Sequence, residues 1–144
     1  MFRAYALTNQ EEISMINLQL QKVLYKRVNS FFEMNGDFEL EVQNTFSMNV
    51  SYTDDKKMCF ATLTNQTNAP KNPDIFNIDL EIIGIFSCQD INSNDDKRDA
   101  HVQIYNYLFP YTQSMVVDLS TKAGLPPLMI ERVDLDPAEI NIND

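Results

Sequence analysis

The stretch FELEVQNTFSMNVSY, residues 38–52, alternates apolar and polar side chains along its length. Its apolar members share one parity, and they are Phe38, Leu40, Val42, Phe46, Met48, Val50 and Tyr52. Because successive side chains of a β-strand point to opposite faces, a period of two places this whole set on one face of a strand. A helix could not gather the same set on one side. The stretch therefore predicts a long strand with one buried face.

Three other segments carry the same alternation. Residues 16–28 begin with it, and MCFATLTNQ at 58–66 follows the turn-forming sequence TDDKK at 53–57. IFNIDLEIIGIFSC, residues 75–88, places a further apolar set on one face, namely Phe76, Ile78, Leu80, Ile82 and Phe86. Asn and Pro in NQTNAPKNPD, residues 65–74, predict a break before this last strand. Alternating strands joined by short turns predict a four-stranded antiparallel sheet with one solvated face.

A helical spacing of three and four residues replaces the alternation after residue 97. It is carried by Ala100, Ile104, Tyr107, Leu108, Tyr111, Met115, Leu119 and Ala123. We expect one long helix over residues 96–123, with Asn94 or Asp95 as N-cap and Gly124 at the C′ position. The apolar spacing passes through Pro110 without a change of phase, which predicts a kink there. The alternative is two helices, the second beginning at Pro110.

The C-terminal residues are predicted to be extended. Pro126 and Pro127 prevent the helix from continuing, and DPAEI at 136–140 fits a short turn capped by Asp136 with Pro137 in its first position. We expect loosely ordered ends at residues 1–12 and 136–144. The fold class that follows is a single α+β domain covering residues 1–144, with a four-stranded antiparallel sheet, one long helix and a short C-terminal element.

Composition excludes several classes of protein. The chain has 144 residues, 44% of them hydrophobic, which is the composition of one globular domain. With 21 acidic and 11 basic residues the formal net charge is −10, which argues against nucleic acid as a partner and suits attraction to basic partners. No signal-peptide apolar segment and no apolar run of about 20 residues occurs, so we expect a cytoplasmic protein without membrane insertion.

The sequence offers little support for catalysis or for a cofactor. His101 has no Ser or Cys nearby in a nucleophile motif, and Asp54–Asp55 and Asp95–Asp96 fit turns and helix capping better than acid–base chemistry. Cys59 and Cys88 lack the spacing of a zinc site. No phosphate-binding glycine motif is present. We therefore expect neither an enzyme nor a metal or cofactor site.

The width of the predicted sheet leads to a further expectation. A helix measures about 10–12 Å across with its side chains, whereas four strands spaced about 4.8 Å apart make a wider surface. One helix therefore leaves apolar sheet surface uncovered, and uncovered surface of this kind favours self-association or ligand binding. Most of the helix's aromatic residues are still expected to pack on the chain's own sheet.

Three motifs resemble the SecB family of bacterial export chaperones. LFPYTQSMVVDLSTKAGLPPLMI, residues 108–130, looks like the family's L-F-P-Y-A-R-E followed by an amphipathic segment and G-x-P-x-L. GIFS at 84–87 is similar to the family's G-I-F-S, and NSFFE at 29–33 to its D-x-S-F-E. The resemblance covers roughly residues 13–135. Thr112 and Gln113 depart from the A-R of the helix motif, and RVDLDP replaces the family's P-V-N-F-D.

The resemblance implies a homo-oligomer, a dimer of dimers with the long helices packed between two sheets. Tyr111, Met115 and Leu119 would then lie in the oligomer interface. It also implies an ATP-independent holdase that binds unfolded or precursor polypeptides in an apolar groove. By position, the groove residues would be Phe86, Leu125, Leu128, Ile130 and Val133.

In the SecB family, acidic residues on the polar face of the sheet dock the export motor SecA. By resemblance the docking residues here would be Glu33, Asp79 and Glu81, although Arg27, Val28 and Asn29 occupy the neighbourhood of the family's Asp. From the residues alone, these carboxylates also fit an ordinary solvated strand face. Two functions remain open: a chaperone for preproteins, and a dedicated module of the same fold that holds one partner such as an antitoxin.

Overall fold

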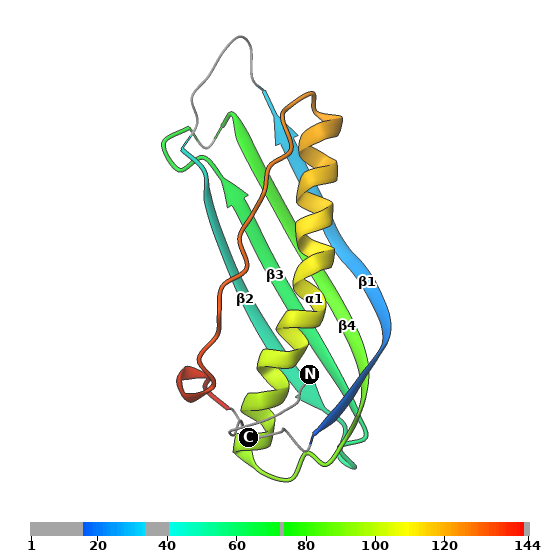
Figure 1. Cartoon of the computed structure of the whole chain (residues 1–144). Helices are drawn as coiled ribbons and strands as arrows, with labels where there is room; N and C mark the ends of the chain where they lie inside the picture. The colour runs from blue at the N-terminus through cyan, green and yellow to red at the C-terminus, as the bar shows by residue number, and fades with distance from the viewer. Residues whose placement is uncertain (1–15, 34–40, 73, 143–144) are drawn as a thin grey trace, which may run out of the picture.

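A computed structural model describes residues 16–33, 41–72 and 74–142 as an antiparallel sheet with one long helix (Figure 1). Along the chain the elements are β1 (Asn17–Phe32), β2 (Gln43–Tyr52), β3 (Met58–Asn68), β4 (Phe76–Gln89), α1 (Asn94–Lys122) and the 3-10 helix η1 (Pro137–Glu139). The strand order is β1-β4-β3-β2, and each neighbouring pair is antiparallel. The predicted α+β class is confirmed. Phe38 and Leu40 of the opening stretch lie outside the described residues.

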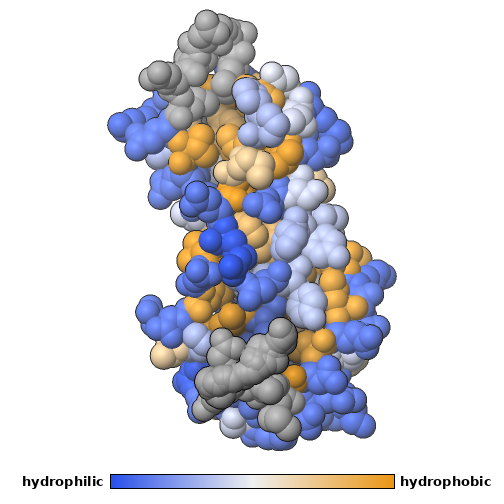
Figure 2. Space-filling view, viewed as in Figure 1, coloured by the Kyte–Doolittle hydropathy of each residue, from blue (hydrophilic) through white to orange (hydrophobic). Residues whose placement is uncertain are grey.

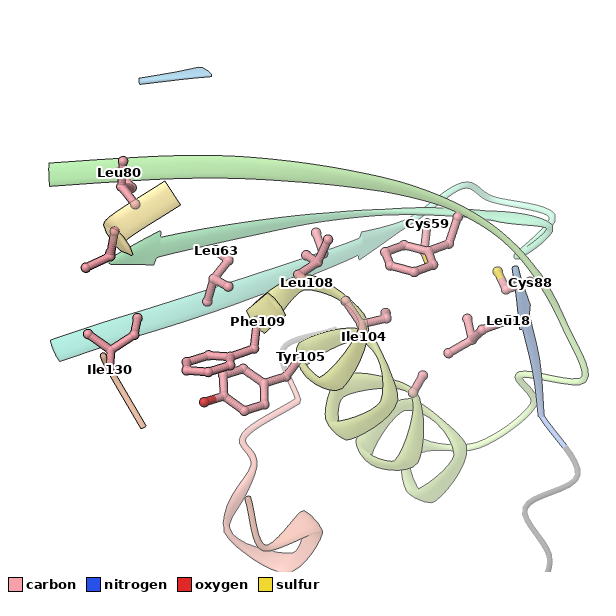
Figure 3. Packing of buried hydrophobic residues seen from close by; sticks show 14 of the residues in the cluster. Leu18, Cys59, Leu63, Leu80, Cys88, Ile104, Tyr105, Leu108, Phe109 and Ile130 are labelled. Atoms are coloured by element: carbon pink, nitrogen blue, oxygen red, sulfur yellow. The ribbon is translucent and has the colours of Figure 1, made fainter. Parts of the chain in front are cut away.

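The apolar core lies between one face of the sheet and α1. On β4 the predicted apolar set is fully buried, since Phe76, Ile78, Leu80, Ile82 and Phe86 have no exposed surface. Figure 3 shows these layers meeting, with Leu63 of the sheet beside Leu108 and Phe109 of α1. The edge strand β2 is covered less well, and its alternate residues are only half-buried. We call the sheet surface away from α1 the outer face.

Strand β3 runs further than its sequence predicts. The break expected from residue 65 begins only after Asn68, because two polar side chains of β3 are buried with their hydrogen bonds satisfied. The Asn65 amide donates to Asn44 Oδ1 at 2.6 Å, and the Thr67 hydroxyl donates to the same oxygen at 2.7 Å. One amide oxygen on β2 therefore allows β3 to carry Asn and Thr on its buried face.

Helix α1 is continuous from Asn94 to Lys122, so the alternative of two helices is wrong. Pro110 cannot donate a hydrogen bond to the carbonyl of Asn106, but both residues are exposed and water can bond that carbonyl instead. A kink at Pro110 remains a prediction. Gly124 follows the helix with φ of 84°, as the predicted C′ residue requires.

The N-cap of α1 is Ser93, not Asn94 or Asp95 as the sequence suggested. Ser93 Oγ accepts from the backbone N–H of Asp96 at 3.1 Å, and the Asp96 carboxylate accepts from the backbone N–H of Ser93 at 3.1 Å. This reciprocal capping box satisfies backbone donors that the start of a helix otherwise leaves unpaired. Ser93, Asn94, Asp95 and Asp96 are all residue types that can cap a helix. Ser93 is the cap because Asp96, three residues later, completes the reciprocal pair of hydrogen bonds.

The buried face of α1 is rotated relative to the predicted apolar spacing. Its buried residues are Ala100, Ile104, Tyr105, Leu108, Phe109, Thr112, Val116 and Ser120. Phe46 of β2 explains the rotation, because its ring lies 5.3 Å from that of Tyr105 and 6.2 Å from that of Phe109. Tyr107 and Tyr111, which the spacing placed in the apolar stripe, are 44% and 36% exposed. The helix therefore has a second, partly exposed aromatic side.

Candidate functional site

Residues 125–140, which we call the strap, return along α1 over the apolar face of β2 and β3 (Figure 1). Four hydrogen bonds join side chains of α1 to the strap backbone. They are Ser120 Oγ accepting from Leu128 N–H at 3.0 Å, Gln113 Nε2 donating to Ile130 O at 2.9 Å, Tyr105 Oη accepting from Val133 N–H at 3.1 Å, and Arg98 Nε donating to Ile140 O at 3.1 Å. The residue numbers of the α1 partners decrease while those of the strap partners increase, so the two segments run antiparallel.

The spacing of these bonds requires an extended strap. From Ser120 back to Arg98 the helix covers about 33 Å at about 1.5 Å per residue. The twelve residue steps from Leu128 to Ile140 cover a similar distance, which is about four-fifths of the roughly 40–43 Å that a fully extended chain of this length reaches, with the short η1 as the compact part. Such a segment has few backbone hydrogen bonds of its own, and the side chains of α1 supply them. The strap is therefore attached to the domain largely through α1 and apolar contacts.

The strap contains four of the five predicted groove residues. Ile130 is 5% exposed and belongs to the core, whereas Leu125 and Leu128 are half-buried against it. Val133 is 49% exposed, and Met129, which the sequence did not single out, is 66% exposed. Figure 2 shows that apolar patches alternate with polar side chains over this face of the molecule. The strap thus combines an apolar underside with apolar side chains that solvent reaches.

Phe86, the fifth predicted groove residue, lies apart from the strap. It is fully buried on β4, and its ring lies 5.8 Å from that of Tyr107. The strap meets the opposite side of α1, where Tyr105 and Phe109 face β2. In this conformation Phe86 has no exposed surface to offer to a ligand.

The strap also changes the expectation about uncovered sheet surface. The strap packs on the apolar surface of β2 and β3, so the part of the sheet that α1 leaves uncovered there is covered by the chain's own C-terminal residues. On the surface of β1 that faces α1, by contrast, two side chains of the strand, Tyr25 and Val28, stay exposed together with Tyr107 and Tyr111 of the helix. We call this group the seam. Its members come from β1 and α1, and the pKa of Tyr25 is raised by burial and by the neighbouring Tyr111.

The predicted interface residues lie at and beside the seam. Tyr111 belongs to it, while Met115 and Leu119, one and two helical turns further along α1, are half-buried and packed against the core. Strand β1 is an edge strand of the sheet in the monomer. A group of large exposed side chains, three of them aromatic, beside an unpaired strand edge is typical of a self-association surface.

The predicted docking acids are only partly brought together. Asp79 and Glu81 lie side by side on the outer face of β4, whereas Glu33 follows the end of β1, where its N–H donates to Ile75 O. The guanidinium of Arg27 contacts both Asp79 and Glu81. Lys26 contacts Glu81 as well, at 3.2 Å. The sequence pattern did not indicate these ion pairs.

A hollow of about 520 Å³ lies at the other end of the strap, between β2, the start of α1 and residues 141–142. Lys56, Lys97 and His101 contribute to its lining, and the Lys97 ammonium lies 5.5 Å from the centre of the Tyr52 ring. Burial lowers the pKa of His101. Within residues 16–33, 41–72 and 74–142, no group of His, Cys, Asp or Glu side chains is placed to hold a metal ion.

The two cysteines are buried neighbours in the core, both with free thiols. Burial raises the pKa of Cys59 to about 12, with the adjacent Cys88 adding to the effect, and it raises the pKa of Cys88 too. Thiols with raised pKa values are poor nucleophiles, so they give no support to a catalytic role.

Among the described helices, none is long and apolar enough to cross a membrane.

Several contributors to this site were not predicted. Tyr105, Ser120 and Arg98 hold the strap, but in the sequence they look like ordinary helix residues. Gln113 stood out only as a departure from the family's motif, and the structure gives it a role in holding the strap carbonyl of Ile130.

Comparisons with known proteins agree with this architecture. The family model described as preprotein translocase subunit SecB matches residues 6–138. The protein-export protein SecB of Orientia tsutsugamushi strain Boryong is 26% identical over 116 residues, which cover 81% of this chain and 71% of that protein. The protein-export protein SecB of Aromatoleum aromaticum is 28% identical over 75 residues, which cover 52% of this chain and 47% of that protein.

Two solved structures share the fold. The Mycobacterium tuberculosis SecB-like chaperone Rv1957, in complex with a ChAD peptide from the HigA1 antitoxin, superposes with a TM-score of 0.68 at 17% identity, covering 83% of this chain and 92% of that one. A Streptococcus agalactiae protein of unknown function superposes with a TM-score of 0.51 at 14% identity, covering 81% and 98%. Since the family model spans nearly all of the sheet, helix and strap described above, the chain belongs to the SecB family.

Proposed function

We propose that this protein is a chaperone that binds non-native polypeptides without nucleotide, with preproteins for export as its clients. The observation that carries the proposal is the strap, an extended segment that lies on an apolar sheet surface and is attached through side chains of α1. Family membership supports it, because the related proteins are named for protein export. The chain needs no cofactor for this function.

An unfolded client resembles the strap in chemistry. It is extended, it alternates apolar side chains with polar backbone, and it can accept or donate the same bonds that Gln113 and Tyr105 make to the strap. A client can add to the exposed Met129 and Val133, or take the place of part of the strap on the sheet. Leu125, Leu128 and Ile130 would then contact the client as the strap moves. Binding of this kind delays folding of the client by mass action alone.

Self-association through the seam is part of the proposal. Tyr111 is exposed, and Met115 and Leu119 continue the same side of α1 toward its end. Burying these residues against a second copy would remove apolar surface from water, which stabilises by roughly 25 cal/mol per Å². A dimer, or a dimer of dimers, would also bring several straps onto one particle, and a long client could then engage more than one of them.

The test is suppression of aggregation of a chemically unfolded substrate diluted from denaturant, followed by light scattering. We expect suppression at stoichiometric amounts and no change on adding ATP. Several substrates of different sequence should be used, because a general chaperone protects most of them. Failure with all of them would reject the general chaperone function.

A second candidate is a binding module of the same fold dedicated to one partner, such as an antitoxin. The pairing of Arg27 with Asp79 and Glu81 favours it, because those carboxylates are less available to an export motor that recognises acids. Purification of the native protein with its bound chains distinguishes the candidates. One stoichiometric partner supports the dedicated module, and a broad set of preproteins supports the export chaperone.

A further inference from the structure

The outer face of the sheet contains a compact cluster of two acids and two bases. Arg27 Nη1 donates to Glu81 Oε1 at 2.8 Å, and Arg27 Nη2 donates to Asp79 Oδ1 at 3.3 Å. Arg27 Nε lies 3.2 Å from Asp79 Oδ2, a charge contact without hydrogen-bond alignment. Lys26 Nζ lies 3.2 Å from Glu81 Oε2. The guanidinium therefore bridges both carboxylates.

An irregularity in β1 produces this cluster. The register between β1 and β4 shifts between Tyr25 and Arg27, so Tyr25 pairs with Ile82 and Arg27 with Glu81. The extra residue, Lys26, is inserted at this point, as in a β-bulge. The consecutive cations Lys26 and Arg27 therefore both contact Glu81. A regular strand would have sent Lys26 and Arg27 to opposite faces.

The carboxylates are partly withdrawn from solvent by this arrangement. The side chains of Glu81 and Asp79 are 14% and 32% exposed, against 39% for Arg27. The cluster has two negative and two positive charges, so its net charge is zero although the chain carries −10 overall. A basic partner that approached Asp79 and Glu81 would have to displace Arg27 before it could pair with them.

We propose that Arg27 is a specificity determinant that closes the Asp79–Glu81 pair to lysine- and arginine-rich partners. Its guanidinium occupies the position that a partner's cation would take. This inference rests on the proposed function only in assuming that the outer face is open to partners. It states that recognition of a basic segment through these two acids is suppressed in this protein, and that a single substitution restores it.

The experiment compares binding of a fluorescent octalysine peptide to the wild type and to Arg27→Ala, by anisotropy at low ionic strength. Removing Arg27 should tighten binding about fivefold, because an exposed ion pair contributes up to about 1 kcal/mol. The gain should fall as salt is added. It should also disappear in the triple variant Arg27→Ala/Asp79→Asn/Glu81→Gln, which has no acid pair to expose.

Lys22→Ala is the matched control. Lys22 lies on the same strand and pairs with Ile85, further along β4 from Glu81, and its removal changes the net charge by the same amount. We expect it to change octalysine affinity by less than about twofold. The proposal is overturned if Arg27→Ala binds no more tightly than Lys22→Ala, or if the triple variant keeps the gain.

Two further measurements keep these outcomes interpretable. Arg27→Gln retains a polar side chain of intermediate length and serves if Arg27→Ala fails to fold, as judged by circular dichroism and thermal unfolding. Aggregation suppression is measured on the same samples and should be unchanged by Arg27→Ala. A wild type that suppresses no aggregation would reject the chaperone function, while the octalysine comparison would still decide the role of Arg27.

Discussion

The hydroxyl of Tyr105 on α1 accepts a hydrogen bond from the backbone N–H of Val133 on the strap, with 3.1 Å between the two atoms. The Tyr105 ring is 1% exposed and packs against both Phe46 and Phe109. One side chain therefore joins the strap to α1 and, through its ring, to β2. Because the ring is fixed by its packing, the hydroxyl can hold the strap without losing further conformational freedom.

Replacing Tyr105 by Phe should loosen the strap while leaving the core filled. The ring contacts remain, and the lost hydrogen bond costs about 0.5–1.5 kcal/mol. We expect hydrogen–deuterium exchange at the Val133 amide to accelerate by up to about tenfold, because the strap opens more easily. Tyr107→Phe is the matched control, since Tyr107 is exposed on the other side of α1. Equal exchange at Val133 in both variants would contradict this role of Tyr105.

Gly84 permits the close approach of α1 to β4. A methyl group at this position would lie 2.7 Å from Leu108 Cδ2 and 2.9 Å from Phe86 Cε1, both in fully buried side chains. Gly84→Ala should therefore lower the free energy of unfolding by about 1–3 kcal/mol, as overpacking of a core does. Urea unfolding followed by circular dichroism measures the change.

Gly124→Ala makes an informative comparison for Gly84. No atom lies within 4 Å of the added methyl at Gly124, but its φ of 84° disfavours any side chain. That substitution should cost about 1 kcal/mol through backbone strain alone. A Gly84 variant as stable as the wild type would show that Leu108 can move aside.

The sequence was sufficient to predict the sheet, because each strand reports its own buried face through a period of two. The long helix and Gly124 at its end were also local features. The rotation of α1 was not, since it depends on Phe46 of β2 meeting Tyr105 and Phe109. Such a contact joins residues far apart in sequence. In a helix with many aromatic residues, two different sides can each show apolar residues spaced by three and four, so the spacing alone does not say which side is buried.

The candidate site was predictable to a similar extent. The four residues after the helix that the family resemblance indicated lie in the strap, and their contact with a client stays a prediction. Their attachment was not predictable, because Tyr105, Gln113 and Ser120 bond to backbone atoms, which any sequence would offer. The pairing of Arg27 with Asp79 and Glu81 depends on an inserted residue in β1. A bulge leaves no reliable mark in a strand that already contains consecutive polar residues.

Tyr111→Asp tests whether the seam is the surface of self-association. We expect the wild type to exceed its monomer mass of 16.6 kDa and the variant to shift toward that mass, because a carboxylate would be buried in the interface without a partner. Size-exclusion chromatography with light scattering measures both. Val133→Asp, an equal charge change at an exposed strap residue, should keep the wild-type mass. If Tyr111→Asp also keeps it, copies of the chain do not meet through the seam.

His101 should make the stability of the fold depend on pH below about 6.5. Burial lowers the pKa of its imidazole from the ordinary value of 6.5 because the protonated ring is poorly solvated beside the start of α1, where Lys56 and Lys97 line the same hollow. In the unfolded chain the pKa returns to about 6.5, so the unfolded state binds more protons in the window between the two values. Stability therefore falls as the pH drops through this window and is insensitive to His101 above it.

His101→Gln removes the titration, and His101 is the chain's one histidine, so the comparison is clean. We expect the urea midpoint of the wild type to fall more steeply than that of the variant between pH 7.5 and 5.0. Carboxylates that titrate at lower pH are common to both proteins, and their effect cancels in the difference. Parallel midpoints across this range would show that the imidazole is protonated as easily in the folded protein as in water, and that the hollow around His101 is open to solvent.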